Sequence, residues 1–75
     1  MNDDINNLTF IEQEAVNSIK IQTIEQLKMA FDLLNGEEFY EIAYFILPSG
    51  TFAYPIKKQL FLEMIIEELG YRNAL

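Results

Sequence analysis

The absence of cysteine and histidine most constrains what this 75-residue chain can fold into. A chain of this length forms one small domain, whose single apolar core contributes only about 3 to 5 kcal/mol of net stability. Many small domains add disulfides or a zinc ion, which need side chains that this sequence lacks. Unusually good packing and oligomerisation remain as stabilisers. Because 51% of the residues are apolar, we expect the second.

Two stretches carry the capping-box pattern that begins a helix. In Thr9–Glu12 the hydroxyl can accept from a first-turn amide while the glutamate accepts from the cap amide. The same pattern at Thr23–Gln26 begins a second helix, which we expect to end at Asn35–Gly36. We expect residues 1–8 to be a frayed N-terminus and residues 9–75 to form a single domain.

Aromatic and β-branched residues are concentrated in Phe39–Leu47, which favours a β-strand. Pro48–Gly50 then supplies turn residues before a second strand at Thr51–Tyr54. The apolar run is too short for its periodicity to decide, so a helix over Glu37–Leu47 is the alternative. In a strand, both faces of this segment are apolar and need to be covered.

Pro55 suits the first position of a third helix, which the pattern predicts through Leu69 with a stop at Gly70. Apolar residues cover most of its circumference, more than an amphipathic surface helix buries. The predicted fold is α+β in the order ααββα, dimerising through the hairpin and the last helix. The most buried side chains should include Phe31, Leu34, Leu60 and Met64. The residues expected at the dimer interface are Tyr40, Tyr44, Phe61 and Ile65.

Twelve acidic residues against five basic ones give the chain a net charge of -7. This charge disfavours direct binding to nucleic-acid phosphates and to an anionic membrane surface. The longest nearly apolar run, Leu60–Ile66, is far shorter than the ~20 residues of a membrane-spanning helix. The first residues lack the basic and apolar segments of a secretory signal, so we expect a cytoplasmic location.

The sequence offers few candidates for catalysis. It has no histidine base and no thiol, and its serines, Ser18 and Ser49, lie outside any nucleophile motif. Paired carboxylates would need a cleft that so small a domain rarely forms. The acidic cluster of Glu37, Glu38 and Glu41 lacks the loop pattern of a calcium hand. We therefore predict that the chain is not an enzyme and uses no metal or cofactor.

The glutamates are the better candidates for binding a partner. Glu63 and Glu67 lie one helical turn apart, about 6 Å along the axis, which is comparable to the spacing of neighbouring phosphates on a nucleic-acid strand. We expect six glutamates to form one continuous exposed surface that binds a basic protein. These residues are Glu37, Glu38, Glu41, Glu63, Glu67 and Glu68.

The segment Val16–Leu27, with the sequence VNSIKIQTIEQL, resembles the helix-loop-helix stretch of helix-hairpin-helix domains. It is also similar to the C-terminal domain of the bacterial RNA polymerase α subunit. In the DNA-binding versions of this stretch, a glycine-rich hairpin presents backbone amides to phosphate. Ser18 or Ile19 stands in place of that glycine, so the resemblance implies the local shape without the phosphate contact.

In size, acidity and Asn/Ile/Lys/Glu-rich composition, the whole chain resembles small phage proteins that disable a host enzyme. Several of these are DNA mimics, among them sliding-clamp, CRISPR and uracil-glycosylase inhibitors. The resemblance implies a noncatalytic inhibitor in the host cytoplasm that binds a basic channel of a DNA-replication or DNA-processing protein. A small dimeric adaptor or regulator that binds its partner through apolar surface is the alternative, and a structural phage or toxin-antitoxin component is a third possibility.

Overall fold

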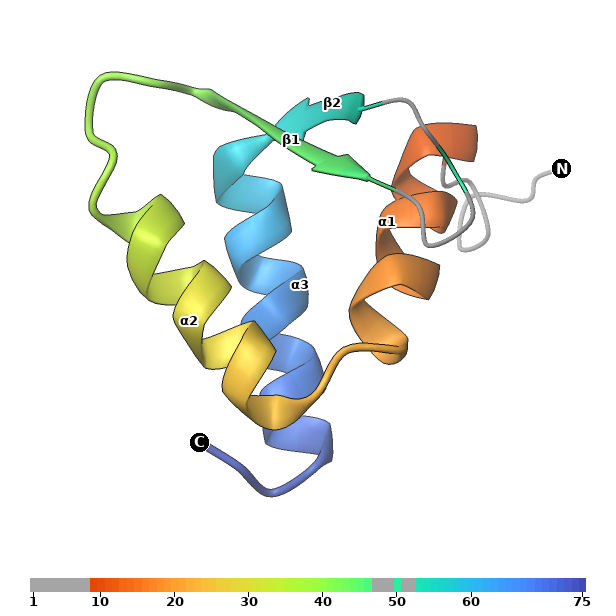
Figure 1. Cartoon of the computed structure of the whole chain (residues 1–75), viewed down its shortest axis with the longest axis vertical. Helices are drawn as coiled ribbons and strands as arrows, with labels where there is room; N and C mark the ends of the chain where they lie inside the picture. The colour runs from red at the N-terminus through yellow and green to blue at the C-terminus, as the bar shows by residue number, and fades with distance from the viewer. Residues whose placement is uncertain (1–8, 47–49, 51–52) are drawn as a thin grey trace, which may run out of the picture.

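The computed structural model describes residues 9–46, 50 and 53–75 (Figure 1). Within these residues, three helices lie beneath one face of an antiparallel hairpin, so the predicted α+β fold in the order ααββα is confirmed. The predicted fraying of residues 1–8 lies outside the described residues. The elements are α1 (Phe10–Lys20), α2 (Ile24–Asn35), β1 (Ile42–Ile46), β2 (Ala53–Lys57) and α3 (Lys58–Tyr71).

Both predicted capping boxes are present. The Thr9 hydroxyl accepts from the Glu12 amide at 3.1 Å, and the Glu12 carboxylate accepts from the Thr9 amide at 3.0 Å. Thr23 and Gln26 make the same pair of bonds at 3.0 and 2.8 Å. Each box satisfies two amides that the first turn of a helix leaves without an intrahelical partner. The two N-terminal helices therefore begin where the sequence predicts.

The segment before the hairpin turn is a strand, so the helical alternative is wrong for Ile42–Ile46. Alternation decides the conformation, because Ala43 and Phe45 are buried on the helices while the residues between them face outward. The strands pair from Ile42 with Lys57 to Ile46 with Ala53. The predicted turn residues Pro48 and Ser49 lie outside the described part of the chain.

Pro55 does not begin the third helix. It lies in β2, opposite Tyr44, and α3 begins at Lys58. Proline is tolerated in an edge strand where its nitrogen faces away from the neighbouring strand. The second strand therefore extends to Lys57, beyond the predicted end at Tyr54.

Gly70 does not end α3 either, because the helix continues through Tyr71. The left-handed residue is Asn73, with a φ of 59°. The Ala74 amide donates to the Leu69 carbonyl at 2.8 Å and the Asn73 amide donates to the Gly70 carbonyl at 3.0 Å. This pair of bonds is the Schellman motif, in which asparagine takes the place more often held by glycine.

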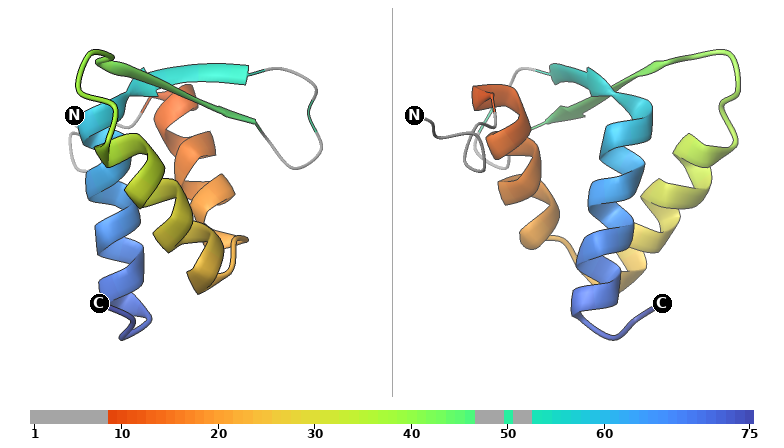
Figure 2. Two further views of the ribbon diagram at one scale, coloured as in Figure 1. Left: turned by 60° about the vertical axis from the view of Figure 1, so that its left-hand side comes forward. Right: turned by 180° about the vertical axis from the view of Figure 1, so that it is seen from behind.

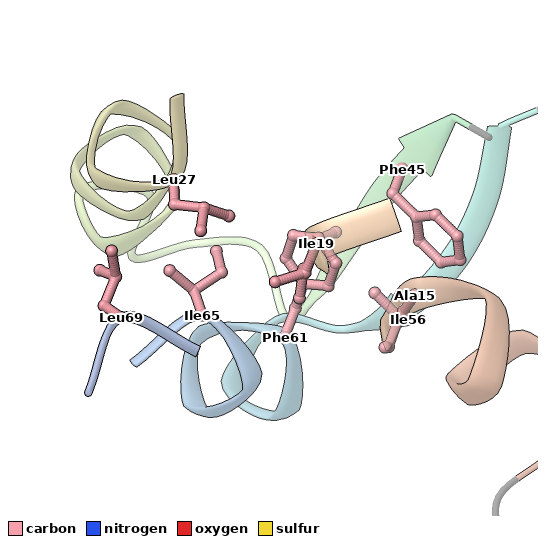
Figure 3. Close-up of a cluster of buried hydrophobic side chains, with 9 residues drawn as sticks. Ala15, Ile19, Leu27, Phe45, Ile56, Phe61, Ile65 and Leu69 are labelled. Carbon is pink, nitrogen blue, oxygen red and sulfur yellow. The ribbon is translucent and has the colours of Figure 1, made fainter. Parts of the chain in front are cut away.

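The core lies between α3 and the other elements, and Leu27 and Ile65 are its largest fully buried side chains. Figure 3 shows Leu27 on α2 pointing toward Ile65 on α3. The prediction that Phe31, Leu34, Leu60 and Met64 are among the most buried side chains is wrong. These four residues are only partly buried, at the edge of this cluster. Residues four apart form the inward stripe of α3, namely Phe61, Ile65 and Leu69, whereas Leu60 and Met64 precede this stripe by one position.

Candidate partner-binding surface

The outward stripe of α3 carries polar residues at every fourth position. Glu63 and Glu67 are both exposed, and the Gln59 side-chain amide donates to the Glu63 carboxylate at 3.5 Å. In the right-hand view of Figure 2, α3 lies in front of the other elements along its whole length. Glu63 and Glu67 therefore lie on an open face, about 6 Å apart along a rigid helix.

The connection between α2 and β1 ends beside the N-terminal end of α3, where the Lys58 amide donates to the Glu41 carbonyl at 2.8 Å. A hollow of about 290 Å³ is lined there by Glu38 and Glu41 together with Gln59. Since Gln59 also contacts Glu63, the acidic connection and the outward stripe of α3 are adjacent. We call this surface the acidic band, and its exposed members are Glu37, Glu38, Glu41, Glu63 and Glu67.

Two lysines lie beside one end of the acidic band. Lys57 and Lys58 line the same hollow as Glu38 and Glu41. The Lys58 ammonium group also donates to the backbone carbonyl of Glu37. These cations partly neutralise the connection between α2 and β1, and at the other end of the band Lys20 lines a groove together with Glu67.

Glu68, the sixth predicted residue, has a different role. Its carboxylate forms an ion pair with the Arg72 guanidinium at 2.7 Å, and its side chain is 16% exposed. Arg72 also donates to the Gln22, Lys20 and Ile19 carbonyls at 2.7, 2.9 and 3.4 Å. Glu68 therefore orients Arg72, which joins the end of α3 to the turn between α1 and α2, and it is not a freely exposed member of the band.

Only three residues separate α1, which ends at Lys20, from α2, which begins at Ile24, and the two helices diverge from this short turn (Figure 1). The turn directs backbone carbonyls toward the Arg72 guanidinium. Carbonyl oxygens attract a cation and repel phosphate, whereas phosphate-binding hairpins direct amides outward. This polarity agrees with the absence of the hairpin glycine and removes the turn from the candidate phosphate sites.

The serines and the acidic side chains are the remaining candidates that the sequence offers for catalysis and metal binding. Ser18 is buried, and its hydroxyl lies 3.5 Å from the Gln22 side-chain amide that donates to it. Ser49 lies outside the described residues. Within the part that the structure describes, no group of three or more acidic side chains is placed to hold a metal ion. In that same part, no helix has the length and apolar character needed to cross a membrane.

The predicted dimer-interface residues divide into two groups. Tyr40 and Tyr44 are exposed, so a second molecule can reach them. Phe61 and Ile65 are 5% and 0% exposed, and Phe61 stacks on Phe45 with ring centroids 5.8 Å apart. Their prediction as interface residues is wrong, because these two side chains are already buried against the α1, α2 and hairpin residues of their own chain.

A groove of about 510 Å³ runs between α1 and α3 beside the acidic band. Val16, Ile19 and Met64 line its apolar part, and Lys20 and Glu67 lie among its polar residues. Carboxylates and accessible apolar surface are thus neighbours on this face of the molecule. No protein-family model, curated protein or solved structure matches the chain, so the geometry of these surfaces is the basis for its function.

Proposed function

We propose that the chain is a noncatalytic inhibitor that binds the basic nucleic-acid-binding surface of another protein, with carboxylates in the place of phosphates. The acidic band is the observation that carries this proposal. Its five carboxylates are exposed, and the ion pair found among the described residues uses Glu68 instead. These five carboxylates outnumber the three lysines that line the adjoining hollows, namely Lys20, Lys57 and Lys58. The excess of negative charge creates a potential that steers a basic surface toward the band.

The helix α3 makes the band suitable for such binding. Its 14 residues span about 21 Å and hold Glu63 and Glu67 at a constant spacing. A rigid display of charge loses less conformational entropy on binding than a flexible acidic tail does. A partner that occupies the band can no longer neutralise phosphates with the same basic side chains. By its likeness to phage inhibitors, the chain would act on a DNA-replication or DNA-processing protein in the host cytoplasm.

Affinity capture from a bacterial lysate, followed by mass spectrometry, tests this proposal. The immobilised chain should retain a nucleic-acid-binding protein at 0.1 M salt and release it at 0.5 M salt, because salt screens exposed charges. The double variant Glu63→Gln, Glu67→Gln should retain much less of that protein. The purified partner should lose DNA binding when the unmodified chain is added.

A matched variant separates the band from net charge. Glu25→Gln with Asp32→Asn removes two exposed charges from α2, outside the band. This control should retain the partner as well as the unmodified chain does. If both double variants retain equally less of the partner protein, net charge alone governs binding and the geometry of α3 does not.

The alternative function is a small adaptor or regulator that binds through apolar surface. Several large apolar side chains favour it, since Phe39 and Tyr71 are almost completely exposed and Leu33 is largely exposed. Binding through such residues should change little between low and high salt. Retention of the same partner at 0.5 M salt, with no effect of the Glu63 and Glu67 substitutions, would therefore support this alternative.

A further inference from the structure

One hydrogen bond identifies the residues of each hairpin strand whose backbone amide and carbonyl point away from the other strand. The Lys58 amide donates to the Glu41 carbonyl at 2.8 Å, directly beyond the paired residues Ile42 and Lys57. Bonded and non-bonded pairs alternate in an antiparallel ladder, so every second residue directs its amide and carbonyl away from the other strand. The residues that do so are Ile42, Tyr44 and Ile46 on β1 and Ala53, Pro55 and Lys57 on β2.

The two edges differ in their ability to accept another strand. Pro55 has no amide and lies in the middle of the β2 edge, where it interrupts any added ladder. The β1 edge contains no proline, and among the described residues no hydrogen bond engages the backbone of Ile42, Tyr44 or Ile46 at that edge. These three side chains are 45%, 68% and 61% exposed. The β1 edge is therefore both open and apolar.

We infer that β1 pairs with β1 of a second copy of the chain. Antiparallel pairing about a twofold axis through Tyr44 aligns the whole strand, with Ile42 opposite Ile46 of the partner subunit. The three outward-directed residues of each copy then meet as hydrogen-bonded pairs. Because the axis is perpendicular to the sheet, the two hairpins form four strands with all helices on one face. This inference does not depend on the proposed function.

The exposed area suits an interface between two copies. Phe39, Tyr40 and Tyr44 are 94%, 64% and 68% exposed. Residues directly opposite each other on antiparallel strands have their Cβ atoms about 4.5 to 5.5 Å apart, so cross-strand side chains contact one another. Pairing about Tyr44 brings Tyr44 beside Tyr44 of the partner subunit and Ile42 beside the partner subunit's Ile46 on the open face of the sheet. Each of these pairs covers part of the apolar area that a single copy exposes.

The charges around β1 are compatible with this pairing. Glu41 precedes Tyr44 by three residues, so the twofold axis places it six residues of strand away from Glu41 of the partner subunit. That separation is about 20 Å, which exceeds the Debye length of about 8 Å at physiological salt. Pairing about Tyr44 therefore keeps these acidic groups apart although each copy carries a net charge of -7.

Residue-resolved amide exchange measured by NMR tests the inference in the unmodified chain. Between low-micromolar and near-millimolar concentration, exchange should slow at the amides of Ile42, Tyr44 and Ile46. The amides of Ala53 and Lys57, on the edge that contains Pro55, should not change. Sedimentation equilibrium should show twice the 8.8 kDa chain mass at the high concentration. A monomer throughout, or equal protection of both edges, would overturn the inference.

Substitutions at the axis provide an independent test. Tyr44→Pro gives the β1 edge a proline at its centre, as Pro55 does for the β2 edge. The substitution removes the Tyr44 amide, which has no hydrogen-bond partner within the described part of the chain. It should raise the dimer dissociation constant at least about tenfold, whereas Tyr44→Val, which keeps the amide, should still dimerise.

Leu33→Lys changes an exposed apolar residue on α2 and serves as the control. Dimerisation that survives Tyr44→Pro but not Leu33→Lys would place the interface on α2. If circular dichroism shows Tyr44→Pro to be unfolded, the amide-exchange pattern decides.

Discussion

Arg72 joins two parts of the chain that lie about fifty residues apart in sequence. Its guanidinium group donates to Glu68, to the Gln22 carbonyl in the turn between α1 and α2, and to the Ile19 and Lys20 carbonyls at the end of α1. Lysine keeps the charge but cannot donate in several fixed directions at once. We expect Arg72→Lys to lower the free energy of unfolding by about 1 to 3 kcal/mol in urea titration. A loss below about 0.5 kcal/mol, the usual effect of a neutral surface substitution, would show that the contact contributes little.

Leu27 and Phe31 separate the centre of the core from its edge. Leu27 is fully buried, whereas Phe31, which the sequence places among the most buried residues, is only partly buried. Leu27→Ala should therefore lower the free energy of unfolding by about 2 to 5 kcal/mol through transfer and cavity terms. Phe31→Ala should lower it less than the larger side chain would suggest. The opposite order of the two losses in urea titration would mean that the core is centred nearer Phe31.

At the scale of single elements, the N-terminal cap of α2 is a local device whose effect can be measured. Thr23→Ala removes the hydroxyl that accepts from the Gln26 amide, so the free energy of unfolding should fall by about 1 kcal/mol. Thr23→Ser keeps the hydroxyl and should behave almost as the unmodified chain in thermal denaturation. A serine variant as unstable as the alanine variant would assign the loss to the threonine methyl group.

Helix starts were predictable because a capping box depends on residues within one turn. The start of α3 was not, since Pro55 fits both the first turn of a helix and an edge strand. Pairing with β1 decides between these, and it depends on residues more than ten positions away. The same reason explains Gly70, because the end of α3 depends on the conformation of Asn73 and not on the nearest glycine.

At the scale of the whole molecule, the inward face of α3 could not be identified from the sequence, because apolar residues cover most of the helix. Such a helix has no single apolar face, so only its packing against α1, α2 and the hairpin shows that Phe61 and Ile65 point inward. The candidate site has the same limit. Sequence identifies Glu63 and Glu67 by their spacing, but the separate role of Glu68 depends on the Arg72 contacts with a distant turn.

Lysine substitutions at the neighbouring residues Glu67 and Glu68 can separate an effect on partner binding from an effect on the stability of the fold. Either change to lysine shifts the net charge from -7 by the same amount, so any difference between the variants reflects position. Glu67 is exposed and follows Glu63 by four residues, so the two like charges are neighbours on the helix and repel each other. Glu67→Lys replaces this repulsion with an attraction. That variant should gain roughly 0.5 kcal/mol of stability and lose partner binding. Glu68→Lys should lose about 1 to 3 kcal/mol, because it leaves Arg72 without its carboxylate.

Urea titration and partner capture on the same two variants complete the comparison. Residues kept for binding often reduce stability, so substitutions there commonly stabilise the fold while removing function. The expected pattern is thus a more stable, non-binding Glu67→Lys beside a less stable Glu68→Lys that still binds in its folded fraction. If Glu67→Lys keeps full binding and Glu68→Lys alone abolishes it under conditions where both are folded, the partner contacts the Arg72 end of α3, and the acidic band is not the binding surface.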